Sequence, residues 1–228
     1  LSKSMAAVAR TLAATLAYCC RAAAPSSARR LVRTQATLPT TRDVDGVAAL
    51  LQDGAKCVVM LGAGASVAAG LPDFRTPGTG LYDTLEISGL PYPEAVFELD
   101  FFRTNPQPFY ELAKALWPTD QSKPTKAHKL VKLLADKDQL VRCYTQNIDS
   151  LERAAGVPAE FVVAAHGNFD SATCIATGEK VDAEALRRAI YEGTTDAFNA
   201  QNGGLCKADI VFFGEALPDR FWASLRED

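Results

Sequence analysis

A run of glycines and small residues follows an apolar segment and has the composition of a phosphate-binding turn. The apolar segment is residues 57–61, and the run after it reads Gly62-Ala63-Gly64-Ala65-Ser66 and continues to Gly70-Leu71-Pro72-Asp73-Phe74-Arg75. Backbone N–H groups that no side chain covers can approach a phosphate closely at such a turn. A G-x-G-x-x-G dinucleotide motif would place its third glycine at Val67, but that glycine is Gly70, and no strand-ending acid follows about 20 residues later. The turn therefore predicts a nucleotide site other than that of a hydride-transferring oxidoreductase.

The chain contains two histidines, and one of them stands where a general base is expected. His166 follows the apolar run 161–165 and precedes Gly167, which predicts an imidazole exposed at the end of a strand. His128 lies inside an amphipathic segment, where a histidine more often packs or caps a helix. We therefore take His166 as the candidate base.

Two further polar side chains come directly after an apolar run. Asn147 and Asp149 follow the run 140–144 and could bind the amide or the ribose of a nucleotide. Asp149 also suits the N-cap of a following helix, and both roles can be combined in one carboxylate.

The elements that must position these residues alternate between strands and helices. Strands are expected at 56–61, 140–144, 161–165 and 210–213, and helices at 44–52, 106–116, 125–135 and 150–155. This alternation predicts an α/β fold with a Rossmann-like, mainly parallel sheet and helices on both faces. Ligands bind beyond the carboxyl ends of such strands, so we expect the four strand ends to meet at one crevice.

Two regions do not follow this alternation. Residues 76–93 are rich in glycine and proline and predict a long functional loop such as a lid. Residues 170–206 are polar apart from a helix expected at 182–191 and predict a small inserted module.

The charges divide the chain of 228 residues into two parts. Residues 1–42 hold seven basic residues and no acid, which leaves 17 basic and 27 acidic residues in 43–228. An Ala-, Ser- and Arg-rich segment without acids is typical of a transit peptide, which predicts the mitochondrial matrix ahead of a plastid or the cytoplasm. The alternative is a disordered basic arm. No segment has the length and apolarity of a membrane span, and no aromatic and basic pattern points to nucleic acid.

Six cysteines without a C-x-x-C pair do not predict a disulfide framework. Cys57 and Cys143 lie in apolar runs, where a thiol acts as a small hydrophobic group.

Four motifs in order resemble the sirtuins, the NAD-dependent protein-lysine deacylases, over about residues 45–225. They are Gly-Ala-Gly-Ala-Ser to Pro-Asp-Phe-Arg (62–75), Tyr-Thr-Gln-Asn-Ile-Asp (144–149), His-Gly (166–167) and Asp-Ile-Val-Phe-Phe-Gly-Glu (209–215). The segments 80–82, 90–95 and 101–110 look most like the mitochondrial deacetylase branch. The resemblance makes 43–228 a partial catalytic domain, with a cofactor loop and helical part at 76–134.

The resemblance implies a role for each matching residue. The cofactor-binding set for NAD is Gly62, Ala63, Gly64, Ala65, Ser66, Asp73, Phe74, Arg75, Tyr82, Gln146, Asn147, Ile148 and Asp149. His166 would be the catalytic base, and Asn147 would act with it. Val211, Phe212, Phe213, Gly214 and Glu215 would pair with the backbone of an acyl-lysine protein or peptide.

By the same resemblance, the expected function is deacetylation by transfer of the acyl group from lysine to ADP-ribose with release of nicotinamide, in the transferase or hydrolase class. The alternative is a degenerate, sirtuin-like protein that binds acyl-lysine peptides or partners without turnover. Phe97, Phe101 and Phe102 suggest an apolar acyl pocket, whereas Arg103 leaves an acidic acyl group open.

The sequence departs from the family in two places. Sirtuins usually hold a structural zinc between two cysteine pairs. Here Cys174 is the one cysteine of the first pair, with Thr177 at the position of the other, and the second pair would fall near Asn199 and Asn202. One cysteine does not supply four zinc ligands, so we expect no metal, and either packing has replaced zinc or the module 170–206 is degenerate. Sirtuins also continue with a Gly-Thr-Ser strand and segments for the adenosine half of NAD, so we expect these residues to hold part of the cofactor site, with one sheet edge unpaired.

Overall fold

The computed structural model describes residues 43–71, 80, 90–118 and 123–228. The chain divides into two compact units, residues 1–53 with Asp228, and residues 54–227. In the first unit the described part is helix α2 (Val44–Gln52), as predicted, whose N-cap Asp43 accepts a hydrogen bond from the Gly46 N–H. The segment 1–42, predicted as a targeting or disordered segment, lies outside the described residues, as does most of the loop predicted at 76–93.

A parallel sheet in the second unit carries the first three predicted strands. Its order is β1 (Cys57–Leu61), β2 (Leu140–Thr145) and β3 (Val162–Ala164). Leu61 pairs with Thr145 and Thr145 with Ala164, so the three carboxyl ends lie level. Within the described residues β1 has only β2 as a strand partner.

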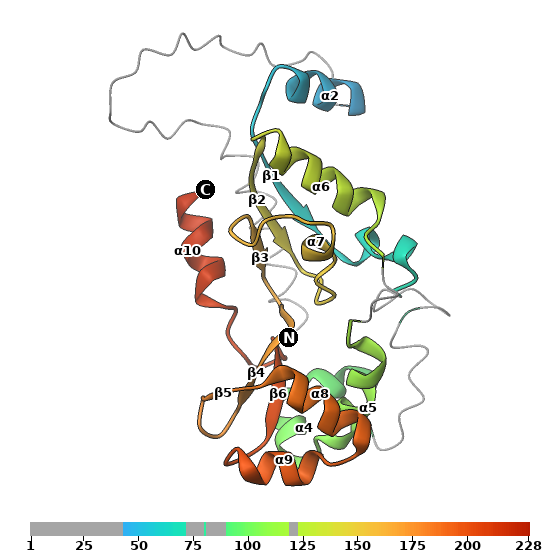
Figure 1. Ribbon diagram of the computed structural model, residues 1–228, viewed down its shortest axis with the longest axis vertical. Helices are drawn as coiled ribbons and strands as arrows, with labels where there is room; N and C mark the ends of the chain where they lie inside the picture. The colour runs from blue at the N-terminus through green and yellow to red at the C-terminus, as the bar shows by residue number, and fades with distance from the viewer. Residues whose placement is uncertain (1–42, 72–79, 81–89, 119–122) are drawn as a thin grey trace. The chain divides into compact units, whose positions relative to one another are not determined.

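Helices flank this sheet on both faces, which confirms the predicted α/β class. Helices α6 (Lys126–Asp136) and α7 (Leu151–Ala154) lie on one side and α10 (Asp219–Glu227) on the other (Figure 1). Thr125 and His128 form a capping box at the start of α6, so the prediction of a capping role for His128 is confirmed. The predicted helix limits at 125–135 and 150–155 agree with the observed ones within one residue.

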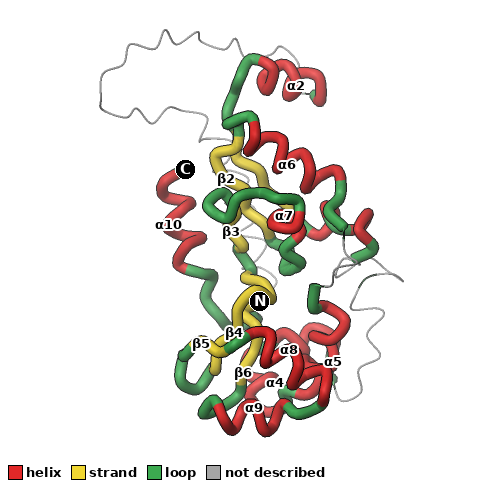
Figure 2. The backbone as a smooth tube through the Cα atoms, in the orientation of Figure 1, coloured by secondary structure: helices red, strands yellow, loops and turns green. Residues whose placement is uncertain are grey.

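A second, antiparallel sheet follows His166 and corrects the prediction for the fourth strand. Its order is β5 (Lys180–Val181), β4 (Gly167–Cys174) and β6 (Cys206–Ile210) (Figure 2). The observed strand β6 overlaps the strand expected at 210–213 only at Ile210, and it does not join the parallel sheet. Phe212, in the apolar run beyond β6, is buried because its ring packs among other aromatic rings.

Short helices cover the antiparallel sheet and enclose its core. They are η3 (Pro93–Phe97), α4 (Leu99–Thr104), α5 (Gln107–Leu116), α8 (Ala183–Glu192) and α9 (Thr195–Gln201). Leu186 and Ile190 of α8 are buried in the same cluster as Cys174 and Cys206. The module 170–206 therefore has a buried apolar core.

A buried hydrogen-bond network joins α5 and α9 to β6. The Tyr110 hydroxyl donates to the Cys206 carbonyl at 2.8 Å and accepts from Asn199 Nδ2 at 3.1 Å. Asn199 Oδ1 accepts from the Cys206 N–H at 3.0 Å. Burial raises the pKa of Tyr110 to about 12, so its hydroxyl keeps its proton at neutral pH.

No helix in the part of the chain that the structure describes has the length and apolarity needed to cross a bilayer.

Tyr110→Phe is expected to lower the free energy of unfolding by about 1–3 kcal/mol, because it leaves the buried Asn199 amide and Cys206 carbonyl without their partner. Tyr191→Phe is the matched control, since the Tyr191 hydroxyl donates to the Lys114 carbonyl from a side chain that is 47% exposed. Urea unfolding measures both variants. Equal losses in the two variants would contradict a structural role for the buried network.

Candidate active site

The turn after β1 consists of two short 3₁₀ helices. They are η1 (Ala63–Ala65) and η2 (Val67–Ala69), and the second ends at Gly70 in the left-handed conformation with φ 82°. A methyl group added at Gly62 or Gly64 would meet no described heavy atom within 4 Å. No described atom therefore crowds the Cβ side of these two glycines.

Side-chain hydrogen bonds tie this turn to the segment after β2. Ser66 Oγ donates to Asp149 Oδ2 at 2.6 Å. Asn147 Nδ2 donates to the Gly62 carbonyl at 3.0 Å and lies 3.2 Å from Ser66 Oγ. Ser66 and Asn147 are only 3% and 6% exposed, so these bonds are shielded from water. The prediction that the two segments meet at the carboxyl edge of the sheet is confirmed.

Asp149 bonds to the start of a helix, which is one of the two roles that the sequence left open, and its second oxygen bonds to the glycine turn. Its Oδ1 accepts from the Leu151 N–H at 2.9 Å, in the first turn of α7, while Oδ2 binds Ser66. The formal N-cap is Ser150, which has φ 56° and makes no side-chain cap bond. One carboxylate therefore satisfies a helix terminus and faces the glycine turn.

His166 lies beside the same segment and has a defined tautomer. Its Nδ1 is 2.9 Å from the Gln146 carbonyl, which can only accept, so Nδ1 carries a proton and Nε2 of the neutral ring is an acceptor. Burial lowers the pKa of His166, and the hydrogen bond to Gln146 opposes this shift only in part. The ring is therefore neutral near pH 7, as a general base must be.

Gly167 is required for this placement of His166. Its φ is 68°, and a Cβ at this position would collide with the Asp209 carbonyl oxygen on β6. The close approach continues at the next pair, where the Val211 N–H donates to the His166 carbonyl at 2.9 Å. The His-Gly sequence thus lets the candidate base and the start of the 211–215 segment lie side by side.

The segment 211–215 is held by its own backbone and by an ion pair that sequence reasoning missed. The Phe213 N–H donates to the Phe97 carbonyl and its carbonyl accepts from the Leu99 N–H. Glu215 accepts from the Phe212 N–H at 2.8 Å and pairs with Lys207 at 2.9 Å. Lys207 is buried, and the only sequence signal was a charged residue inside an apolar strand.

Aromatic rings line the buried side of this segment. Phe97, Phe102, Phe109 and Phe212 are all at most 6% exposed, with ring centroids between 4.8 and 6.3 Å apart in five edge-on pairs. The Phe212 ring therefore anchors the segment. Arg103 points to Asp100, with which it forms an exposed ion pair at 2.9 Å.

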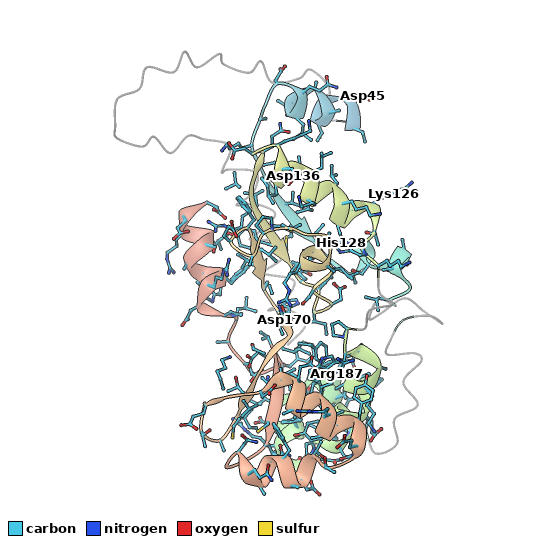
Figure 3. All side chains as sticks on the ribbon, viewed as in Figure 1. Asp45, Lys126, His128, Asp136, Asp170 and Arg187 are labelled. Atoms are coloured by element: carbon cyan, nitrogen blue, oxygen red, sulfur yellow. The ribbon has the colours of Figure 1, made fainter. Side chains whose placement is uncertain are left out.

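Sequence reasoning also missed a cluster of titratable side chains formed by His128, Asp149 and Glu152. His128 Nδ1 accepts from the Thr125 N–H at 3.1 Å, and one ring nitrogen lies within 4.8 Å of carboxylate oxygens of Asp149 and Glu152. Figure 3 shows His128 on α6. Burial raises the pKa of Glu152 and lowers that of His128. The amphipathic segment around His128 indicated packing or capping of a helix, but not the nearby carboxylates, because Asp149 and Glu152 lie in another part of the sequence.

A cavity of about 250 Å³ opens on the other side of Asn147. It runs along β3 to the Arg153–Asp170 ion pair and does not include Ser66, Asp149 or His166. It shares Asn147 with the hydrogen-bonded residues at the carboxyl edge of the sheet.

Of the other residues in the predicted set, Gln146 donates its N–H to the Leu61 carbonyl, and Ile148 packs against the hydrophobic core. Asp73, Phe74, Arg75 and Tyr82 lie outside the described residues.

The residues at the family's zinc position do not fit that metal. Cys174 has Thr177 beside it in the following turn, and Asn199 and Asn202 bond to protein groups through their amides. Tetrahedral structural zinc needs four thiolate or imidazole ligands.

Comparison with known proteins agrees with the motifs. The family model described as "Sir2 family" matches residues 62–228. "NAD-dependent protein deacetylase hst2" of Schizosaccharomyces pombe is 47% identical over 191 residues, which are 83% of this chain and 57% of that protein. Sirtuin-2 of Danio rerio is 45% identical over 190 residues, 81% of this chain and 49% of that protein.

Sirtuin-3 of Mus musculus is 48% identical over 177 residues, which are 77% of this chain and 52% of that protein. The chain spans about half the length of the curated relatives it matches.

The imidazole of His166 is expected to titrate with a midpoint below pH 6.5, because burial favours its neutral form. As the pH falls through that midpoint the ring gains a proton and ceases to be an acceptor at Nε2. The chemical shift of its Cε1 proton, assigned by its disappearance in His166→Ala, measures the midpoint. A midpoint at or above pH 6.5 would contradict the buried, neutral state.

Proposed function

Since the chain belongs to the Sir2 family, we propose that it is an NAD-dependent protein-lysine deacetylase that transfers the acyl group to ADP-ribose and releases nicotinamide. The observation that carries the proposal is the set of hydrogen bonds among Ser66, Asn147 and Asp149, next to the neutral base His166. The relatives it resembles have names that describe NAD-dependent protein deacetylases.

NAD, when bound, supplies a glycosidic bond to nicotinamide whose cleavage makes acyl transfer possible. The open turn Gly62–Ser66 would hold its phosphates, and Asn147, Ile148 and Asp149 with Gln146 would hold the nicotinamide ribose and carboxamide. Two observations support this fit: the space beside Gly62 and Gly64 is open, and Asp149 presents a carboxylate at the turn. Asp73, Phe74, Arg75 and Tyr82 complete the set by family resemblance alone.

His166 moves the proton in this proposal. Its Nδ1–H is held by the Gln146 carbonyl, which fixes the ring and leaves Nε2 to accept a proton from a ribose hydroxyl. A ring held in one orientation favours this proton transfer. The amide oxygen of the acyl-lysine is a weak nucleophile, so its attack also depends on its being held close to the reacting carbon.

The acyl-lysine protein or peptide would bind along Val211–Glu215. Both backbone groups of Phe213 already pair with Phe97 and Leu99, and the Val211 N–H pairs with His166, so strand-like pairing with the peptide falls to the Val211 carbonyl and to Gly214. The Lys207–Glu215 ion pair holds the shape of this segment. Binding would therefore read the peptide backbone more than its sequence.

An acetyl group is the acyl group that we propose. The buried rings of Phe97, Phe102 and Phe212 offer no partner to a carboxylate. Arg103, which could offer one, is already paired with Asp100.

For residues 1–42 we propose a targeting segment for the mitochondrial matrix, on the evidence of seven basic residues and no acid. A fluorescent protein carrying residues 1–42 is then expected to co-localise with a matrix marker. A diffuse cytoplasmic signal, or a plastid signal in a plant cell, would contradict this assignment.

His166→Ala is expected to lower peptide-dependent nicotinamide release by about 10²–10⁴-fold, which is the usual contribution of a general base. The assay follows nicotinamide released from NAD in the presence of an acetyl-lysine peptide. Lys56→Ala is the matched control, because it removes only an exposed ion pair with Asp138 and should leave the rate unchanged.

Binding of the peptide by the wild type without any nicotinamide release would overturn catalysis and favour the binding-only alternative. Release that is the same in wild type and His166→Ala would instead contradict the role given to His166.

A further inference from the structure

The amides at two of the family's zinc positions are engaged in hydrogen bonds within the module 170–206. Asn199 uses its oxygen for the Cys206 N–H at 3.0 Å and its nitrogen for the Tyr110 hydroxyl at 3.1 Å. Asn202 Nδ2 donates to the Phe198 carbonyl at 2.8 Å. Both amides thus act as structural hydrogen-bonding groups, and of the four family positions only Cys174 keeps a thiol.

A second thiol, Cys206, faces Cys174 across the antiparallel ladder. The two residues are direct partners in the register of β4 and β6. The Ile175 N–H donates to the Leu205 carbonyl at 2.8 Å, so the ladder bonds flank the cysteine pair and the pair itself is of the non-hydrogen-bonded type.

The spacing of such a pair matches that of a disulfide. The Cα atoms of a non-hydrogen-bonded antiparallel pair are about 4.5 Å apart, and a disulfide spans Cα separations of about 4.4–6.8 Å. The side chains of directly opposed residues point to the same face of the sheet. Both thiols are fully buried on that face, against the same core.

We propose that Cys174 and Cys206 form a reversible cross-strand disulfide that braces the module in place of zinc. The oxidant is a low-molecular-weight disulfide of the glutathione class. The Cys174 thiolate attacks one sulfur of the oxidant and expels one thiol, and the Cys206 thiolate then attacks Cys174 Sγ and expels the second. The protein loses two electrons and two protons, and one oxidant disulfide is reduced to two thiols.

Formation of this disulfide depends on the access of the oxidant to Cys174 and on the redox state of the compartment. Gly204 closes over the pair so tightly that a Cβ there would lie 2.6 Å from Ala176 Cβ and 3.4 Å from Cys174 Sγ. The oxidant therefore reaches Cys174 only when the turn at 202–205 opens. The usual Cα spacing of a non-hydrogen-bonded pair, about 4.5 Å, is near the short limit for a disulfide, and strained disulfides are the more easily reduced ones. The pair is thus a dithiol in a reducing compartment and a disulfide under oxidative conditions.

The bond would close a loop that contains α8 and α9, residues 175–205. Constraint of such a loop lowers the entropy of the unfolded chain and stabilises the fold. β4 begins directly after His166, and β6 ends directly before Val211. The disulfide would therefore link the two strands that hold His166 and the start of the segment 211–215.

The experiment compares the 228-residue protein after incubation with reduced or oxidised glutathione. Differential alkylation and peptide mass mapping locate the linked cysteines, metal analysis measures zinc, and thermal unfolding measures stability. We expect a single Cys174–Cys206 link, far less than one zinc per chain, and an unfolding midpoint about 5 °C or more higher in the oxidised protein.

Two variants keep the result interpretable. Cys206→Ala should abolish the link and the shift in midpoint, whereas Cys57→Ser, in the parallel sheet, should keep both. Full alkylation of both thiols after oxidation, a link to any other cysteine, an unchanged midpoint, or one zinc per chain would each overturn the proposal.

Discussion

The hydrogen bond from Ser66 to Asp149 is the contact on which the rest of the site depends. It joins the turn after β1 to the segment after β2 at a separation of 2.6 Å, in surroundings from which water is largely excluded. A hydrogen bond to a carboxylate in such surroundings is worth more than one between neutral groups. Asn147 adds bonds to the same turn, so the glycine backbone and the polar segment form one rigid unit. His166 is then placed by its bond to Gln146 in that segment.

The antiparallel strands β4 and β6 carry the residues on the other side of the site. Gly167 permits a backbone approach that no side chain allows, which brings Val211 against His166. The Lys207–Glu215 ion pair and the aromatic rings then hold the segment 211–215 from behind. A buried ion pair is costly unless further hydrogen bonds support it, and here the Phe212 N–H and the Ile210 carbonyl provide them. The chain from the end of β4 to the start of β6 also contains the family's zinc positions. The stability of this sheet therefore affects both His166 and the segment 211–215.

Much of this arrangement could be predicted from sequence, and the misses have physical reasons. Helix limits followed from periodicity and caps, and the meeting of Ser66 with Asp149 followed from the rule for parallel strand ends. The strand at 210–213 was misplaced because an apolar run does not say which sheet it enters. Lys207 was missed because a buried charge is recognised only with its partner, and Glu215 comes from another segment. The pairing of Cys174 with Cys206 depends on register, which no local pattern in the sequence specifies.

The central claim is that the unit formed by Ser66, Asn147 and Asp149 binds NAD, and calorimetric titration of NAD tests it most directly. In Asp149→Asn a single side-chain oxygen would have to accept from both the Ser66 hydroxyl and the Leu151 N–H. The account therefore predicts an affinity for NAD about 10- to 100-fold lower than that of the wild type. Asp170→Asn, which removes a carboxylate from the Arg153 ion pair, should bind NAD as the wild type does. Equal affinity of wild type and a folded Asp149→Asn would contradict the account.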